Sequence, residues 1–565
     1  MWTQYLYALW PELLLVATAC VLFLLGTANS VASRRLAPVI SLIALGVVFI
    51  VNVFQHTTRL GDPDPTGVVL VDNLAIYVTM LASGMGILFV LLSWPTSSDS
   101  TRNSALDVGP DVGEYFALML LAITGIMLVA GAQDIILLFL GIELASIPTY
   151  IMVSISRPLP IAQEAGVKYF FLGAMSAAIM LFGFSYLYGT TGYTQLGQIA
   201  AVLHEQPGGL NTWQLLALVM LLAGFAFKIA AVPLHAYAGD VYQGAATPVT
   251  ALLAFVPKTS GFIAIIKILS VIAGPKWIAP DVVIQLLWVI AVLTMTFGNV
   301  LGLLQFNVKR VLAYSSVAHS GYMLVGLTAL LAAKGLPNST EIQTTALAGV
   351  LFYLAAYGVM NTGAFGVLML LPGRTDAPGR HGPGGEPLST AESAETFEDL
   401  AGQGRNNLVL GLAMAVCCLS LTGLPLTVGF FGKVLLIKPA LDVARVDNPF
   451  QTRMVWLVVI TMVNAAISAA YYLKIISTMF LRTESSEAAQ AAGIVPARRP
   501  AFRSAPVLLA VGLSALGTIF FGVFLPGTSA LTNRVLEATG IQSRETPAGP
   551  QQPTIRAVNA SADAR

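Results

Sequence analysis

Long hydrophobic runs, separated by short polar stretches, extend over most of the chain. A run of about 20 apolar residues crosses the hydrocarbon core of a membrane, and it must be helical because lipid offers no partner to an open backbone. Window hydropathy predicts about fourteen such spans. Their approximate ranges are 7–26, 37–55, 73–93, 113–131, 135–155, 163–188, 212–236, 245–272, 281–304, 309–332, 345–371, 407–432, 454–480 and 504–526.

The composition excludes a water-soluble fold. Hydrophobic residues make up 56% of the 565 positions, charged residues only 10%, and the mean hydropathy is +0.78. Soluble domains carry about 25% charged residues. The predicted fold class is therefore an all-α, polytopic membrane protein that lies in a lipid bilayer. The formal net charge of +1 gives no reason to expect a nucleic acid or another strongly charged partner.

The distribution of basic residues predicts an orientation. Loops after odd-numbered spans hold thirteen Lys and Arg residues, and loops after even-numbered spans hold six. Because basic loops stay in the cytoplasm, both termini are predicted outside it. The first residues, MWTQYLYALWPELLL, have no basic region and no small-residue cleavage site. They are interpreted as the lead into the first span and not as a removable signal.

A weak internal repeat divides the spans. GVKYFFLGAMSAAIMLFG in the sixth span resembles GVLFYLAAYGVMNTGAFG in the eleventh, and VPL in the seventh matches LPL in the twelfth. An offset of five helices inverts the second unit, and inverted repeats with interrupted helices are typical of transporters. The expected divisions are three N-terminal spans (1–110), two inverted five-helix repeats (111–272 and 273–481), a last span (482–540) and a disordered tail (541–565). Residues 373–406, rich in Gly and Pro, are predicted to form a flexible cytoplasmic loop.

Several ionisable residues lie where hydrocarbon is expected. Those well inside spans are Glu143, Lys228, His235, Lys258, His319 and Lys433, while Lys168, Lys267 and Lys474 lie nearer span ends. A lysine at the bilayer centre costs about 2.5–3.5 kcal/mol on insertion scales. Such residues therefore usually face the interior of the bundle and have a partner or a task.

Desolvation gives these lysines a possible chemistry. An isolated buried lysine can lose about 3–5 pKa units, which brings it near neutral pH, and a nearby carboxylate reverses that shift. If Glu143 approaches Lys228, the lysine holds its proton, and if the pair separates, the proton leaves. Lys228 is thus a candidate proton site. The alternative is a static buried ion pair that joins two helices.

Prolines accompany these charges. Pro148 follows Glu143 by five residues, Pro233 follows Lys228 by five, Pro257 directly precedes Lys258, and Pro425 precedes Lys433 by eight. A proline inside a helix removes a hydrogen bond and kinks the helix. The freed carbonyls and the bend leave room for the water that proton transfer needs.

The other candidates also have simpler interpretations. Lys258 and Lys433 could snorkel or bind carbonyls. Lys168 could pair with Glu164 four residues before it. His235 lies seven residues after Lys228 on roughly the same helical face, and a proton relay and a structural role are equally open for it and for His319. Snorkelling to the interface is favoured for Lys267 and Lys474.

Motifs for soluble chemistry do not occur. The sequence has no GxGxxG after a strand, no GxxxxGK[ST] and no cysteine cluster. Cys20, Cys417 and Cys418 lie in apolar runs without metal-ligand spacing and are interpreted as buried apolar residues.

Four stretches resemble the antiporter-like membrane subunits of respiratory complex I, the proton-translocating NADH–quinone oxidoreductase. They are PLHAYAGDVYQGAATPVTALLAFVPKTSGF (233–262), VKRVLAYSSVAHSGYMLVG (308–326), GVKYFFLGAMSAA and LTGLPLTVGFFGKVLL. The form DVYQG-x-x-TPVTA is similar to the N-type subunits of that family. The resemblance covers about residues 5–530.

The resemblance implies roles for individual residues. Glu143 matches a fifth-span glutamate that modulates a seventh-span lysine, here Lys228. Lys258 matches a central lysine, and Lys433 matches the lysine of a broken twelfth span. Among the secondary residues, Lys168 matches a sixth-span lysine and His319 a polar residue on a hydrated central axis.

The resemblance also implies a setting for the chain. It would translocate protons in a bacterial plasma membrane beside L- and M-type subunits. No cofactor is expected in this chain, since NADH, FMN, iron–sulfur clusters and quinone would belong to other subunits.

Two features depart from the family pattern, and other functions stay open. The chain has Tyr237 and Gly239 where the family turn usually has Trp and Pro, and the 373–406 loop looks longer than usual. A subunit of a multi-subunit cation/proton antiporter shares the expected fold. A purely structural membrane spacer and a quinone-binding role are further alternatives.

Overall fold

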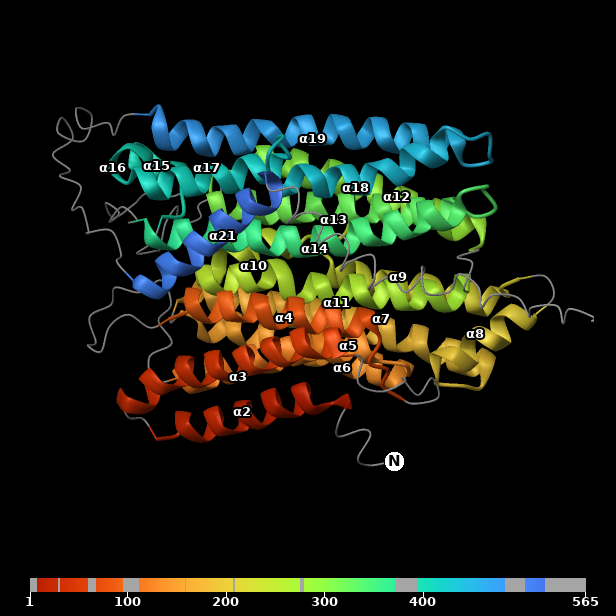
Figure 1. The fold of residues 1–565 in the computed structure, drawn as a ribbon, viewed down its shortest axis with the longest axis horizontal. Coiled ribbons are helices and arrows are strands. Elements are labelled where there is room, and N and C mark those ends of the chain that lie inside the picture. Colours follow the sequence, from red (N-terminus) through yellow and green to blue (C-terminus); the bar gives the residue numbers. More distant parts are fainter. Residues whose placement is uncertain are drawn as a thin grey trace, which may run out of the picture.

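The computed structural model describes residues 8–28, 31–58, 68–94, 111–157, 159–206, 209–274, 279–371, 394–482 and 504–523. Within these ranges the chain is helical, with a few isolated β-bridges. Most helices lie nearly parallel, stacked from α2 to α19, and α21 crosses them obliquely (Figure 1). The helices are α2 (Trp10–Gly26), α3 (Val31–Thr58), α4 (Asn73–Leu92), α5 (Val112–Gly131), α6 (Ile135–Ile155), α7 (Pro160–Thr191), α8 (Leu196–Glu205), α9 (Thr212–Lys228), α10 (Ala238–Gly244), α11 (Thr247–Ala273), α12 (Asp281–Leu303), α13 (Val308–Ala332), α14 (Ser339–Leu370), α15 (Phe397–Leu400), α16 (Gln403–Asn406), α17 (Leu408–Thr422), α18 (Val428–Ala444), α19 (Gln451–Phe480) and α21 (Ala505–Val523).

The helices account for every predicted span. Eleven helices of the described ranges are long and apolar enough to cross a membrane. The shorter α2 and two interrupted spans, α9–α10 and α17–α18, complete the predicted fourteen. The all-α, polytopic fold class is therefore confirmed. Helix α8 lies between the sixth and seventh spans and was not predicted.

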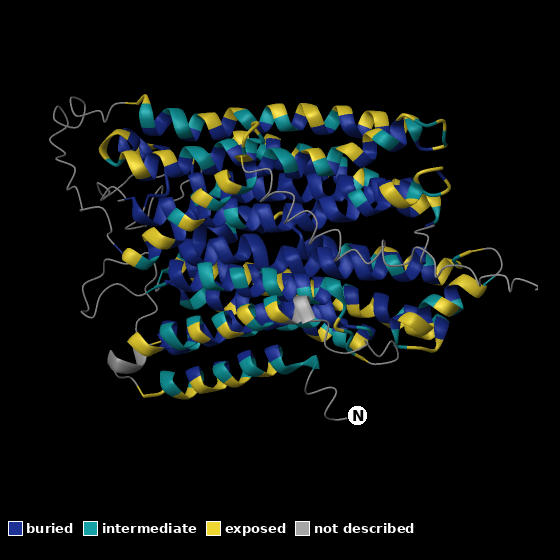
Figure 2. Cartoon of the chain, viewed as in Figure 1, coloured by how far each residue is buried: buried dark blue, intermediate teal, exposed yellow. Residues whose placement is uncertain are grey.

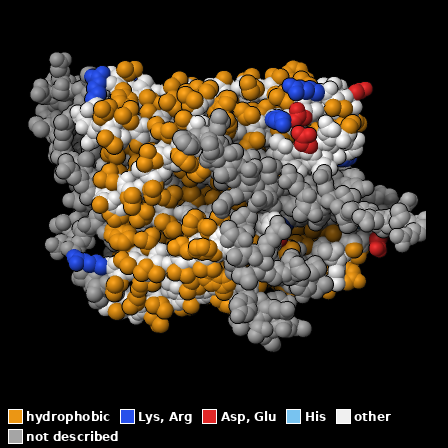
Figure 3. Space-filling view, in the orientation of Figure 1, with side chains coloured by type: hydrophobic (Ala, Val, Ile, Leu, Met, Phe, Trp, Pro, Cys, Tyr) orange, Lys and Arg blue, Asp and Glu red, His pale blue; other side chains and the backbone are white. Residues whose placement is uncertain are grey.

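Burial separates central helices from peripheral ones. Helices α11 and α13 and most of α14 are buried, whereas α2, α3, α19 and α21 expose one face (Figure 2). The exposed faces are apolar, as at Leu24 of α2 and Leu516 of α21. On the face shown in Figure 3, charged side chains gather toward the two ends of the helices, with hydrophobic side chains between them. This is the surface expected of a protein surrounded by lipid.

Two spans are broken, and the breaks correct the predicted ranges. Helix α9 ends at Lys228, and residues 229–237 are not helical. Helix α17 ends at Thr422, and α18 continues to Ala444, beyond the predicted end at 432. Pro233 and Pro425 lie in these non-helical links and not inside helices, whereas Pro148 and Pro257 are inside helices as predicted. Hydropathy windows average over such links and cannot locate them.

The breaks occupy corresponding positions in the two repeats. The five spans of the first repeat are α5, α6, α7, α9–α10 and α11. Those of the second repeat are α12, α13, α14, α17–α18 and α19. In each set the fourth span is interrupted, as the VPL and LPL match indicated. The borders of the units at 110, 272 and 481 stay predictions.

The last part of the predicted flexible loop is folded. Residues 372–393 and the tail 541–565 lie outside the described residues. Residues 394–406, called the anchor segment here, are folded into α15 and α16 and contain buried Ala394, Phe397 and Leu400. The prediction is wrong for this part because Gly and Pro concentrate before it, and averaging composition over 373–406 concealed the apolar residues that follow.

The interpretation of the cysteines is confirmed for two of three. Cys417 and Cys418 are buried in α17, but Cys20 is exposed on the outer face of α2. Hydropathy places a residue inside a span but does not tell which face of the helix it occupies, so the prediction for Cys20 was wrong.

Candidate functional site

Lys228 is the last residue of α9, next to the break. Its side chain is 1% exposed, and its amine donates hydrogen bonds to Glu143 Oε1 at 2.9 Å, Ser146 Oγ at 2.9 Å and Tyr150 OH at 3.2 Å. All three acceptors lie on α6 and are spaced so that they share one helical face. The sequence predicted the Glu143 partner, and the structure places it in direct contact.

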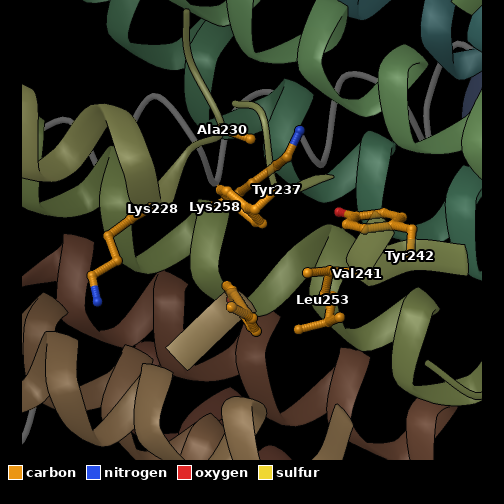
Figure 4. Close-up of a pocket in the computed structure, with 8 residues that line it drawn as sticks. Lys228, Ala230, Tyr237, Val241, Tyr242, Leu253 and Lys258 are labelled. Carbon is orange, nitrogen blue, oxygen red and sulfur yellow. The ribbon is translucent and has the colours of Figure 1, made fainter. Parts of the chain in front are cut away.

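Aromatic rings pack around the Lys228 side chain. The rings of Tyr169 and Tyr237 stack with centroids 5.2 Å apart, and Tyr150 meets Tyr169 edge-on at 4.5 Å. A small cavity beside them is lined by Tyr169, Lys228, Ala230, Tyr237, Val241, Tyr242, Leu253 and Lys258. Figure 4 shows the amines of Lys228 and Lys258 directed away from one another across it. The cavity therefore joins two lysines whose charged ends point to different helices.

The two departures from the family turn have local physical reasons. The Tyr237 hydroxyl donates to the Phe227 carbonyl at 2.9 Å and so bridges the break after α9. A Cβ added at Gly239 would lie 2.9 Å from Tyr314 OH and 3.2 Å from an Arg310 nitrogen. The glycine thus lets α13 approach α10 closely.

Lys258 lies in the middle of α11 and is buried. Its amine donates to the Ser316 carbonyl and, at 2.9 Å, to Ser320 Oγ, and it lies 5.2 Å from the Tyr357 ring centroid. These partners among the described residues are a carbonyl, a hydroxyl and a ring face. Ser320 in turn donates to the Ile229 carbonyl at 2.6 Å, which connects this lysine to the break beside Lys228.

His319 is held between two phenols. Its Nδ1 lies 2.6 Å from Tyr353 OH and its Nε2 lies 2.9 Å from Tyr472 OH. Tyr472 also contacts the hydroxyl of Ser315. A neutral imidazole donates a hydrogen bond at one nitrogen and accepts one at the other. Tyr353, His319 and Tyr472 therefore form a hydrogen-bonded file, in which all donors can be oriented toward Tyr353 or all toward Tyr472.

Rings connect His319 to the lysines on both sides. The Tyr357 ring lies 5.0 Å from the His319 ring and faces the Lys258 amine. On the other side the Tyr322 ring lies 5.6 Å from His319, and the Lys433 amine sits 5.0 Å from its centroid. His319 therefore lies between Lys258 and Lys433.

Lys433 lies at the second break, between α17 and α18. It lies on α18, and its amine donates to the Leu421 and Thr422 carbonyls at 3.0 and 2.7 Å, at the end of α17. The C-terminus of a helix leaves carbonyls unpaired and carries partial negative charge, so it attracts a cation. Gly423 has φ +87°, and a Cβ there would lie 2.8 Å from the Lys433 side chain. Both the backbone and the close approach of the lysine require glycine at this position.

Lys228, Lys258 and Lys433, with His319 between the last two, form a buried row. Lys168 lies apart from this row. It is 44% exposed and pairs with Glu164 at 2.8 Å and with Asp240 at 2.9 Å, while Arg310 binds the other oxygen of Asp240 at 2.8 Å. The i,i+4 pair that the sequence offered as an alternative is thus present, as part of a surface ion cluster.

The remaining candidates do not join the row. His235 was expected on the Lys228 face of a continuous helix, but α9 ends at Lys228, so that expectation is wrong. The His235 ring lies near Phe297, and its Nδ1 has no partner among the described residues. Lys267 is buried and donates to the Ala132 carbonyl at the end of α5 at 2.8 Å, so it does not snorkel. Lys474 is partly buried over the Phe397 ring.

Sequence reasoning missed the uncharged members of the site. The residues that contact the candidate amines and imidazole include Ser146, Tyr150, Ser316, Ser320, Tyr322, Tyr353, Tyr357 and Tyr472. The available signal was positional, because Ser146 and Tyr150 follow Glu143 by one and two helical turns. Serines and tyrosines are otherwise too common in spans to indicate function.

Comparison with known proteins agrees with the sequence resemblance. The family model described as "NADH:quinone oxidoreductase/Mrp antiporter, TM" matches residues 132–468. An NADH-quinone oxidoreductase subunit N from Trichlorobacter lovleyi is 36% identical, over 91% of this chain and 93% of that protein. Another from Myxococcus xanthus is 34% identical, over 84% and 88% respectively.

Solved structures share the fold. A chain of respiratory complex I from Thermus thermophilus with bound Aureothin superimposes with a TM-score of 0.68 at 28% identity, covering 92% of this chain and 97% of that one. A chain of the Mrp complex from Dietzia sp. superimposes with a TM-score of 0.70 at 18% identity, which shows the fold alone. The chain therefore belongs to the NADH:quinone oxidoreductase/Mrp antiporter transmembrane family, within which it is similar to the N subunits.

Proposed function

We propose that this chain is a membrane-arm subunit of a proton-translocating NADH–quinone oxidoreductase. Its task is to carry protons across the membrane while electrons pass from NADH to quinone elsewhere in the complex. The observation that carries this proposal is the row of buried amines, Lys228, Lys258 and Lys433, two of which lie at helix breaks and one of which contacts Glu143. The relatives of similar sequence, NADH-quinone oxidoreductase N subunits, support the same assignment.

The geometry supports a relay in three stages. Contact with Glu143 keeps the proton on Lys228, and separation of the pair frees the lysine to pass it on toward Lys258, whose side chain lines the same small cavity. The described partners of Lys258 are a carbonyl, a hydroxyl and a ring face, with no carboxylate among them, and the lysine is the next proton carrier of the relay. His319 then connects Lys258 to Lys433, which discharges at the second break.

The setting of the chain follows from the same proposal. Electron transfer is assigned to other subunits that hold FMN and iron–sulfur clusters, since no motif for such groups occurs in this sequence. The membrane neighbours are L- and M-type subunits in a bacterial plasma membrane. The bias of basic residues supports an orientation with both termini outside the cytoplasm.

Isolation through a tag on this chain tests membership of the complex. We expect the tagged chain to bring down a membrane assembly with NADH–quinone reductase activity whose turnover acidifies one side of proteoliposomes. Isolation of an assembly that exchanges sodium for protons without NADH would overturn the proposal in favour of an antiporter subunit. Deletion of the chain should abolish coupled proton movement, measured at matched complex content.

The phenols around His319 provide a finer prediction. Tyr353→Phe and Tyr472→Phe each remove one end of the hydrogen-bonded file, and each is expected to slow proton transfer through this chain about 10-fold or more. The loss of one hydrogen bond costs about 0.5–1.5 kcal/mol of stability, too little to prevent assembly. The measurement is proton uptake per electron in proteoliposomes.

Tyr77→Phe is the matched control for these two variants. Tyr77 is also buried, and its hydroxyl donates to the Leu351 carbonyl of α14 at 3.1 Å and not to His319. Equal effects of all three substitutions would show that any buried phenol matters for stability alone, and the relay through His319 would then be wrong.

A further inference from the structure

The anchor segment, residues 394–406, is fastened at both ends. At its start, the Ala394 amide donates to the Leu371 carbonyl at 3.0 Å, and the Val308 amide donates to the Glu395 carbonyl at 2.7 Å. Near its end, Gly402 bonds the Thr478 carbonyl at 3.3 Å and Arg405 bonds the Phe480 carbonyl at 2.6 Å. The segment therefore joins the ends of α13 and α14 to the end of α19, and it leads directly into α17 at one end of the bundle (Figure 1).

Glu395 is the charged centre of this segment. It is 2% exposed, and its carboxylate binds Arg157 at 3.0 Å and Lys309 at 3.3 Å, which are themselves 6% and 0% exposed. The Lys309 amine also donates to the Gln243 and Ala245 carbonyls at 3.2 and 2.6 Å, at the end of α10. The Glu395 carboxylate thus connects Arg157, near the end of α6, to Lys309 of α13 and, through Lys309, to the end of α10.

The charge on Glu395 is maintained by its partners. Burial alone raises the pKa of a carboxyl group, but the charges of Lys309 and Arg157 outweigh burial and hold the pKa of Glu395 below its usual value. The side chain is therefore ionised at neutral pH. Its contribution is a fixed negative charge between two positive ones.

Each element that meets at Glu395 also carries part of the proposed relay. Arg157 lies two residues after the end of α6, which holds Glu143, and Lys309 lies in the first turn of α13, which holds His319. Helix α10 is the second half of the span that bears Lys228, and the anchor segment precedes α17, whose end binds Lys433. The cluster of Arg157, Lys309 and Glu395 therefore contacts both repeats and the first broken span, and the anchor segment leads along the chain into the second.

We propose that Glu395 is a positioning residue that holds the relay helices of the two repeats in register. The inference rests on the proposed proton-translocating function. The carboxylate fixes the α6 end and the α10 end relative to α13, and so sets the approach of Glu143 to Lys228. Because the same segment runs into α17, a change at the first pair is passed to the second break through one rigid connection.

The test is Glu395→Gln in the intact complex. This substitution keeps the shape of the side chain and removes its charge, leaving Arg157 and Lys309 facing each other. We expect quinone reduction per complex to be retained, and protons moved per electron to fall by the same fraction as in Lys228→Met. Hydrogen–deuterium exchange should accelerate at least 10-fold in both 238–246 and 394–406. An unchanged proton ratio would overturn the inference.

Two further variants separate positioning from simple charge balance. Glu395→Gln alone leaves two cations facing each other and should lower complex content. Adding Arg157→Gln removes their repulsion, so complex content should recover while the proton ratio stays low. Recovery of the proton ratio as well would show that Glu395 only neutralises charge. Glu398→Gln, an exposed carboxylate in the same segment, should leave both readings unchanged.

The outcome for the inference is distinguishable from the outcome for the proposed function. If Lys228→Met lowers the proton ratio and Glu395→Gln does not, the proposed function stands and the positioning role fails. If neither variant changes it, the relay itself is wrong.

Discussion

Replacing Lys228 with methionine is expected to stop proton movement through this chain while quinone reduction continues. Methionine has similar length and fills the same space, but it cannot carry a proton. A positioned acid–base group accelerates proton transfer by about 100-fold or more, so the chain's share of proton translocation should disappear. Protons moved per electron, measured in proteoliposomes at matched complex content, is the decisive quantity.

A second variant distinguishes the relay from a static ion pair. Lys228→Met leaves the Glu143 carboxylate of α6 without its lysine partner, and breaking a buried pair in this way costs about 3–5 kcal/mol. Adding Glu143→Gln removes that charge and should restore stability. If the pair only joins helices, the double variant should pump normally, because uncharged partners of similar shape pack as well. We expect it to stay inactive in proton transfer.

Lys334→Met is the control for loss of a lysine. Lys334 lies beyond the end of α13 and pairs with Asp281 at 2.5 Å, outside the buried row. It should retain the full proton ratio. A normal ratio in Lys228→Met itself would contradict the mechanism.

Lys433→Arg is expected to preserve assembly and to block proton transfer. The guanidinium can still donate to the Leu421 and Thr422 carbonyls, so the second break stays satisfied. An arginine does not release its proton in a protein. The chain should therefore hold a permanent charge at this point, and the proton ratio should fall about as far as in Lys228→Met.

Lys433→Ala is expected to impair assembly as well as proton transfer. It removes the charge and leaves two carbonyls without a partner, at about 1–3 kcal/mol for each buried group. Complex content should then fall together with the proton ratio. Lys438→Arg on the same helix is the matched control, since Lys438 is exposed. Normal proton translocation in Lys433→Arg would show that this lysine acts only as a fixed charge.

The sequence predicted the helices and the charged residues of the site because their signals are local. Hydropathy located each span, and a buried lysine with a distant glutamate suggested the pair of Lys228 and Glu143. The pairing could be expected because isolated charges are costly in lipid. The structure added that Ser146 and Tyr150 complete the same face of α6.

Other features depend on tertiary contacts and were out of reach. The end of α9 at Lys228 follows from the backbone of 229–237, so periodicity placed His235 on a face that does not exist. Glu395 lies in polar sequence and gains importance only because Arg157 and Lys309, far apart along the chain, meet there. The tyrosines around His319 come from α14 and α19, and no spacing connects them.

The two helix interruptions are closed by different chemical groups, and this has a spectroscopic consequence. A phenol, Tyr237, satisfies the carbonyl of Phe227, whereas the ammonium of Lys433 satisfies those of Leu421 and Thr422. Charge-assisted hydrogen bonds are about twice as strong as neutral ones. Carbonyl stretching frequencies at 421 and 422, resolved by isotope-edited infrared difference spectroscopy, should therefore shift each time Lys433 is discharged, while the band of Phe227 stays in place.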